Sequence, residues 1–210
     1  MHVPIQWIVL AACRCAPAHH EGGAAAPGHF EDAPSLLRAV EAGDLPAAAV
    51  AARGMDGGWP TEEAGRAGRR ALEDLHAAVG FIVAAADAGE AADGLARVAE
   101  SCGACHLAER VSVGRPSPEV SGHARATEAL WWAVVSGDSA RGREVAARLA
   151  EDPPRAREGM RSSDAADRVL EAARAARTDL PPSDLLATVV GACGDCHRAA
   201  ADATDGVGPG

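Results

Sequence analysis

Cys102-Gly103-Ala104-Cys105-His106 and Cys193-Gly194-Asp195-Cys196-His197 are two copies of one pattern, Cys-x-x-Cys-His, and they lie 91 residues apart. Together they use four of the six cysteines of this 210-residue chain. Each copy comes at the end of a segment with helical periodicity, and only 13 residues follow the second copy. The chain is therefore predicted to contain two related units, each with this motif near its end.

The Cys-x-x-Cys-His pattern is the attachment signature of haem c, in which two thiols form thioethers and the histidine is the proximal iron ligand. Two alternatives use the same residues: a redox dithiol or disulfide, which needs no following histidine, and one structural zinc shared by both cysteine pairs. The sequence predicts two haem c groups. The predicted thioether residues are Cys102, Cys105, Cys193 and Cys196, and the predicted proximal iron ligands are His106 and His197.

The composition predicts an all-α fold. Apolar residues make up 48% of the chain and are mostly alanine, whereas aromatic residues are only 3% and tyrosine is absent. Alanine is the best helix former, and the residues that favour strands are sparse. A core built from alanine is thin, so we expect haem to contribute to stability.

The net charge is −10, and every basic residue is arginine. Such a negative field disfavours nucleic acid and anionic membranes, and it favours redox partner proteins with basic surfaces. Simple solubility is the plain alternative explanation for the same charge.

The N-terminal segment resembles an export signal. The apolar run Ile5–Ala12 is too short to span a bilayer, and Leu10-Ala11-Ala12-Cys13 resembles a bacterial lipoprotein box. Ala16-Pro17-Ala18 offers an ordinary cleavage site instead. We expect an exported, periplasmic protein, either anchored by a lipid at Cys13 or without an anchor; Cys15 has no assigned role.

The two halves of the chain repeat each other. Gly28-His29 corresponds to Gly122-His123 and Gly43-Asp44 to Gly137-Asp138, both at an offset of 94 residues. The predicted organisation is a leader (1–18), a flexible linker (19–28), a first four-helix bundle (29–112), a linker (113–121), a second four-helix bundle (122–203) and a disordered tail (204–210).

Four helices are predicted in each bundle. Those of the first are a helix with Pro34 in its first turn that Gly43 ends, Leu45–Arg53, Thr61–Ala86 and Glu90–Arg110. Those of the second are a helix that Gly137 ends, Ser139–Ala150, Ser163–Arg177 and a helix that starts at Pro181-Pro182.

A haem motif at the end of a fourth helix resembles the class II cytochromes c, that is, cytochrome c′ and its low-spin relatives. A downstream methionine ligand, as in mitochondrial-type cytochrome c, is excluded for the second motif because neither Met nor His follows His197. The resemblance implies a distal haem side that faces the first helix of the same bundle. It is compatible with a homodimer and with two tandem bundles that pack against each other.

His29 and His123 stand at equivalent positions of the two repeats and are the predicted distal iron ligands. His123, Thr127, Leu130 and Val134 share one helical face. Pro34 is a reservation, since a helix that starts there would leave His29 on a loop. The alternative ligands Met55, His76 and Met160 have no counterpart in the other repeat.

The predicted function is electron transfer rather than catalysis, because two six-coordinate haems leave no open iron site. The alternative is a gas-binding or sensing protein, similar to cytochrome c′, with at least one five-coordinate haem. The discriminating feature is whether His29 and His123 bind iron.

Overall fold

The computed structural model describes residues 29–56, 65–110, 123–151, 163–176 and 180–205. Within these ranges the side chains of residues 29–31, 123–125, 163, 200 and 202–205 are not described. The predicted leader, both predicted linkers, Thr61 and Met160 lie outside the described residues. The described part of the chain is all-helical and contains no strand, which confirms the predicted all-α class.

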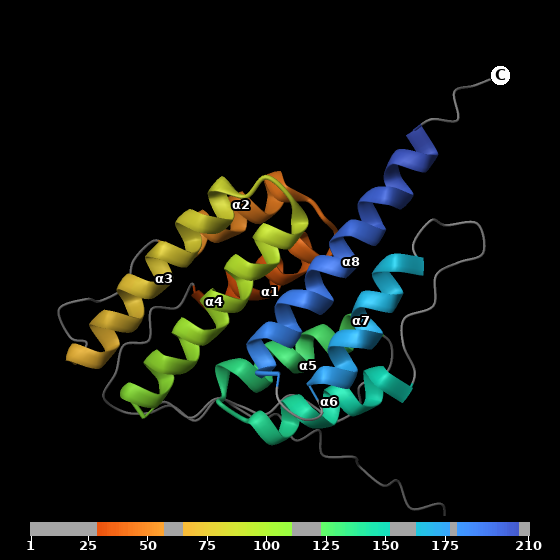
Figure 1. Cartoon of the computed structure of the whole chain (residues 1–210). Helices are drawn as coiled ribbons and strands as arrows, with labels where there is room; N and C mark the ends of the chain where they lie inside the picture. Colours follow the sequence, from red (N-terminus) through yellow and green to blue (C-terminus); the bar gives the residue numbers. More distant parts are fainter. Residues whose placement is uncertain (1–28, 57–64, 111–122, 152–162, 177–179, 206–210) are drawn as a thin grey trace, which may run out of the picture.

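Eight α-helices follow one another along the described chain (Figure 1). The helices of the first half are α1 (His29–Glu41), α2 (Leu45–Met55), α3 (Arg66–Ala84) and α4 (Ala88–Ala108). Those of the second half are α5 (His123–Val135), α6 (Ser139–Glu151), α7 (Ser163–Ala175) and α8 (Pro182–Asp205).

The same local device ends the first helix of each half. Gly43 and Gly137 adopt positive φ angles of 69° and 67°, a left-handed conformation that glycine takes without steric cost. The aspartate that follows each glycine caps the next helix. Asp44 accepts a hydrogen bond from the Ala47 N–H at 3.0 Å, and Asp138 accepts one from the Arg141 N–H at 3.0 Å.

Pro34 does not delay the start of α1, which begins at His29 and holds the proline as its sixth residue. The predicted position in the first turn was therefore wrong. A proline this close to the helix start removes only one backbone hydrogen bond, so the helix tolerates it. His29 consequently begins a helix rather than lying on a loop.

Several other helix ends differ from the prediction. Helix α3 begins at Arg66, with Gly65 as its N-cap, rather than at Thr61, and it ends at Ala84 rather than Ala86. Helix α4 spans Ala88–Ala108 rather than Glu90–Arg110.

Helix α2 continues two residues further, to Met55, whose side chain is only 1% exposed, because its burial stabilises the longer helix. Helix α8 continues to Asp205 and so includes the first two residues of the predicted disordered tail.

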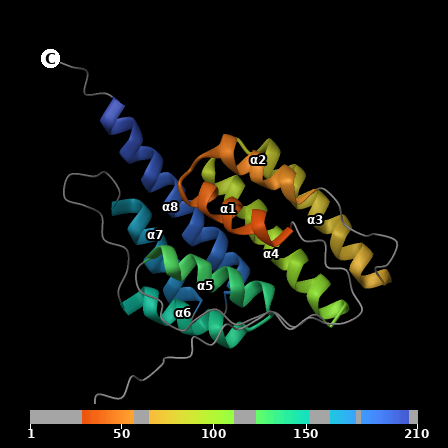
Figure 2. The ribbon, with the colours of Figure 1, turned by 180° about the vertical axis from the view of Figure 1, so that it is seen from behind.

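Helices α4 and α8 lie side by side in the middle of the molecule (Figures 1 and 2). Helices α1–α3 lie on one side of this pair and α5–α7 on the other. One continuous cluster of buried apolar side chains, rich in alanine, runs through both halves. No helix in the described ranges has both the length and the apolar character needed to cross a bilayer.

Candidate functional site

The first motif occupies the last turns of α4. Its residues Cys102, Cys105 and His106 stand at i, i+3 and i+4, so they share one face of the helix. All three side chains are partly buried, and the Nδ1 atom of His106 is shielded from solvent. Helix α4 ends at Ala108, two residues after the histidine, whereas the sequence predicted its end at Arg110.

The second motif lies in the middle of α8, which continues for eight residues after His197, so the prediction of a motif at the helix end was wrong for this copy. Cys193 is 8% exposed, Cys196 is partly buried and His197 is exposed. Asp195, between the two cysteines, accepts hydrogen bonds at 2.7 Å from Arg168 of α7 and from Arg198. The motif is thus tied to a neighbouring helix by an ion pair that the sequence did not predict.

The four motif thiols are free cysteines. Burial, together with the neighbouring Cys105, raises the pKa of Cys102 to about 12. Burial also raises the pKa of Cys193 to about 12, with further contributions from Glu41 and Cys196. Reactive redox dithiols have depressed pKa values, whereas burial raises the pKa of Cys102 and Cys193.

A glycine in each motif packs against the first helix of the opposite half. A Cβ atom on Gly103 would lie 2.9 Å from the carbonyl oxygen of Val134, near the end of α5. A Cβ atom on Gly194 would lie 2.8 Å from the carbonyl oxygen of Val40, near the end of α1. Val40 and Val134 are equivalent positions of the repeat, so the two contacts are related by its internal symmetry.

The glycines that end α1 and α5 also lie against the motif-bearing helix of the opposite half. A Cβ atom on Gly43 would lie 2.7 Å from Cγ of Arg198, and one on Gly137 would lie 3.8 Å from Cδ1 of Leu107. Arg198 and Leu107 each directly follow the histidine of a motif. The only sequence signal for this packing was the presence of glycine at the same position of both motifs.

A buried polar contact joins the first helices of the two halves. The Thr127 hydroxyl, which is completely buried, donates a hydrogen bond to the Glu41 carboxylate. Burial raises the pKa of Glu41; Glu128 also raises it, while the bond from Thr127 and the charge of Arg38 lower it. The sequence did not predict a role for Glu41. Its charge contributes to the raised pKa of Cys193 in the second motif.

The predicted distal ligands begin the two equivalent helices, His29 in α1 and His123 in α5, but their side chains are not among those described. Each of the two positions shares a helix face with residues further along the same helix that are buried. The completely buried residues on these two faces are Leu36, Val40, Thr127 and Leu130.

The alternative ligands have other surroundings. His76 is exposed and pairs through Nδ1 with the carboxylate of Asp56. Met55 is buried at the end of α2. Trp131 is buried within the apolar core cluster.

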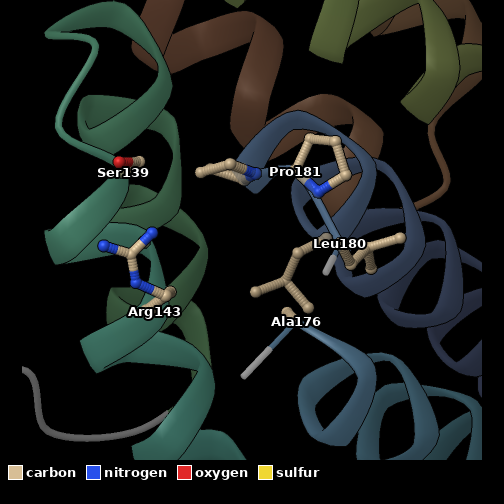
Figure 3. A pocket seen from close by; sticks show the side chains of 8 residues that line it. Ser139, Arg143, Ala176, Leu180 and Pro181 are labelled. Carbon is tan, nitrogen blue, oxygen red and sulfur yellow. The ribbon is translucent and has the colours of Figure 1, made fainter. Parts of the chain in front are cut away.

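A cavity of about 210 Å³ lies where the start of α6, the end of α7 and the start of α8 meet (Figure 3). Its lining is mainly apolar, with the guanidinium of Arg143 and the hydroxyl of Ser139 at its edge. It is lined by Ser139, Gly142, Arg143, Ala176, Leu180, Pro181, Pro182 and Leu185. None of these residues belongs to either motif.

The two cysteine pairs do not converge on one point. Among the described residues, no group of three or more His, Cys, Asp or Glu side chains is gathered closely enough to hold a metal ion. A structural zinc site needs four ligands around a single ion, so one shared zinc does not fit this geometry. The donor set of each motif, two thiols and an imidazole on one helix face, instead fits haem c.

Comparison with known proteins adds no relative: no family model, no curated protein and no solved structure matches this chain.

Proposed function

We propose that this protein is an exported dihaem cytochrome c that carries electrons, built as two tandem four-helix bundles. The observation that carries the proposal is the repeated Cys-x-x-Cys-His motif, present twice on helices with its thiols free. A dithiol enzyme would need reactive thiolates, and a zinc site would need the two pairs to converge. Neither condition is met by the described residues.

Each half supplies its own attachment residues. Cys102 and Cys105 would hold one haem and Cys193 and Cys196 the other, with His106 and His197 as proximal ligands. When bound, haem c supplies one-electron chemistry between ferric and ferrous iron. The packing of Gly103 and Gly194 against neighbouring backbone supports a rigid helix at each attachment point.

His29 and His123 would complete the coordination on the distal side. This assignment is supported by the positions of His29 and His123, which share a helix face with buried residues of α1 and α5. Two six-coordinate haems would have lower potentials than haems with a methionine ligand, since methionine raises the potential.

The acidic surface supports redox partners with basic docking faces and no nucleic-acid partner. Export to the periplasm, with or without a lipid at Cys13, is part of the same proposal, because haem c is attached outside the cytoplasm.

The test is an optical spectrum of the exported, matured protein, oxidised and reduced, with and without carbon monoxide. Two covalent, low-spin haems that do not bind carbon monoxide are expected. His123→Ala should open one haem to carbon monoxide, whereas His76→Ala, which removes the exposed histidine paired with Asp56, should not.

Absence of covalent haem would overturn the proposal. Carbon monoxide binding by the unmodified protein would favour the gas-binding alternative, because it requires an open iron site.

A further inference from the structure

The central helices α4 and α8 run antiparallel. A Cβ atom on Gly191 would lie 3.5 Å from Cβ of Ala92, and one on Gly194 would lie 2.7 Å from Cβ of Ala88. As the residue numbers rise along α8, those of its contacts on α4 fall. Figures 1 and 2 show the same opposed course of the two helices.

This register separates the two motifs. His106 lies 18 residues after Ala88, which at 1.5 Å per residue is about 27 Å along α4. His197 lies three residues beyond Gly194, or about 4.5 Å in the opposite direction. The proximal histidines are therefore about 30 Å apart along the axis of the helix pair.

We propose that the chain holds two independent haem centres, one near each end of α4, each exchanging electrons separately. This inference rests on the proposed dihaem function. It excludes a stacked haem pair that would store two electrons as one unit.

The distance makes the two centres electrostatically independent. Two unit charges 30 Å apart change each other's redox equilibrium by a factor of about 1.3 in water, and about 2.5 at an effective dielectric constant of 20. At 10 Å, the second of these factors would be about 17. Salt weakens the interaction across 30 Å further, because this distance exceeds the screening length several-fold.

Different side chains follow the two motifs. Leu107, directly after the first motif, is 70% exposed. Arg198, its equivalent after the second motif, is ion-paired with Asp195. The surroundings of the two motifs therefore differ: an exposed apolar side chain follows the first motif and an ion-paired arginine follows the second.

The experiment compares the matured protein with two single-haem variants, Cys102→Ser/Cys105→Ser and Cys193→Ser/Cys196→Ser. The redox titration of the dihaem protein should equal the sum of the two single-haem titrations, each equilibrium shifted by less than about 2.5-fold. A shift of more than tenfold would overturn the proposal.

Electron paramagnetic resonance of the oxidised, unmodified protein gives a second readout that does not depend on the variants folding. Two superposed ferric signals without mutual coupling are expected, and strong magnetic coupling would overturn the proposal. The two possible failures are distinguishable. Absence of covalent haem would refute the proposed function, whereas two bound haems that couple would refute only the independence of the two centres.

Discussion

Gly194→Ala tests the contact between the second motif and the opposite half of the chain. The added methyl group would lie 2.7 Å from Cβ of Ala88 and 2.8 Å from the carbonyl oxygen of Val40. Neither atom is the tip of a flexible side chain, so α8 must shift away from α1 and α4.

Overpacking of this kind costs about 1–3 kcal/mol. Replacing a helical glycine by alanine returns about 1 kcal/mol of helix propensity. The net loss is therefore up to about 2 kcal/mol, or a decrease in Tm of up to about 8 °C for a chain of this size, and relative to an unhindered Gly→Ala change it is about 1–3 kcal/mol.

The chain offers two matched controls in helices. A Cβ atom on Gly191 meets Ala92 at an ordinary 3.5 Å, and one on Gly80 meets no atom within 4 Å. Gly191→Ala should be neutral or slightly stabilising, and Gly80→Ala should stabilise by about 0.5–1 kcal/mol.

The assay is urea unfolding of the matured protein, followed by far-ultraviolet circular dichroism. If Gly194→Ala were as stable as the Gly191→Ala control, the close packing of α8 against both helices would be refuted.

Three further predictions concern stability and thiol chemistry. Because burial raises the pKa of Glu41 above 4.5, the unfolded chain loses this proton first as the pH rises. The free energy of unfolding should therefore fall as the pH rises from about 4.5 through the folded pKa of Glu41. Urea unfolding between pH 4 and 8 measures this dependence, and Glu41→Gln should flatten it. An unchanged pH dependence in the variant would contradict the prediction. In the folded haem-free chain, Cys102 and Cys193 should react with iodoacetamide at neutral pH about thirty- to sixtyfold more slowly than unperturbed thiols. A pKa of about 12 rather than 9 lowers the thiolate fraction about a thousandfold, while the more basic thiolate is more nucleophilic. Mass spectrometry of tryptic peptides measures this, and equal rates in the folded and urea-unfolded chain would contradict it. Leu130→Ala should lower the free energy of unfolding by about 2–5 kcal/mol, because Leu130 is completely buried. Leu107→Ala is the control: this residue is mostly exposed, so the free energy of unfolding should change by less than about 0.5 kcal/mol.

Local features of the sequence determined the helices. Apolar spacing and the glycines at positions 43 and 137 predicted the ends of α1 and α5, because a positive φ is a property of the residue and its immediate neighbours. The position of each motif on the last helix of its half followed from the same periodicity. The prediction for Pro34 failed because one missing hydrogen bond near a helix start costs little.

The tertiary structure alone decided how the halves meet. The close approach of Gly103 to Val134 and of Gly194 to Val40 joins residues far apart in the chain, and the spacing of residues within one helix carries no information about such contacts. The pairing of Glu41 with Thr127 depends on the same long-range packing. The sequence thus determined which side chains each helix carries for chemistry, whereas the antiparallel packing of α4 and α8 decided that the two motifs lie near opposite ends of α4.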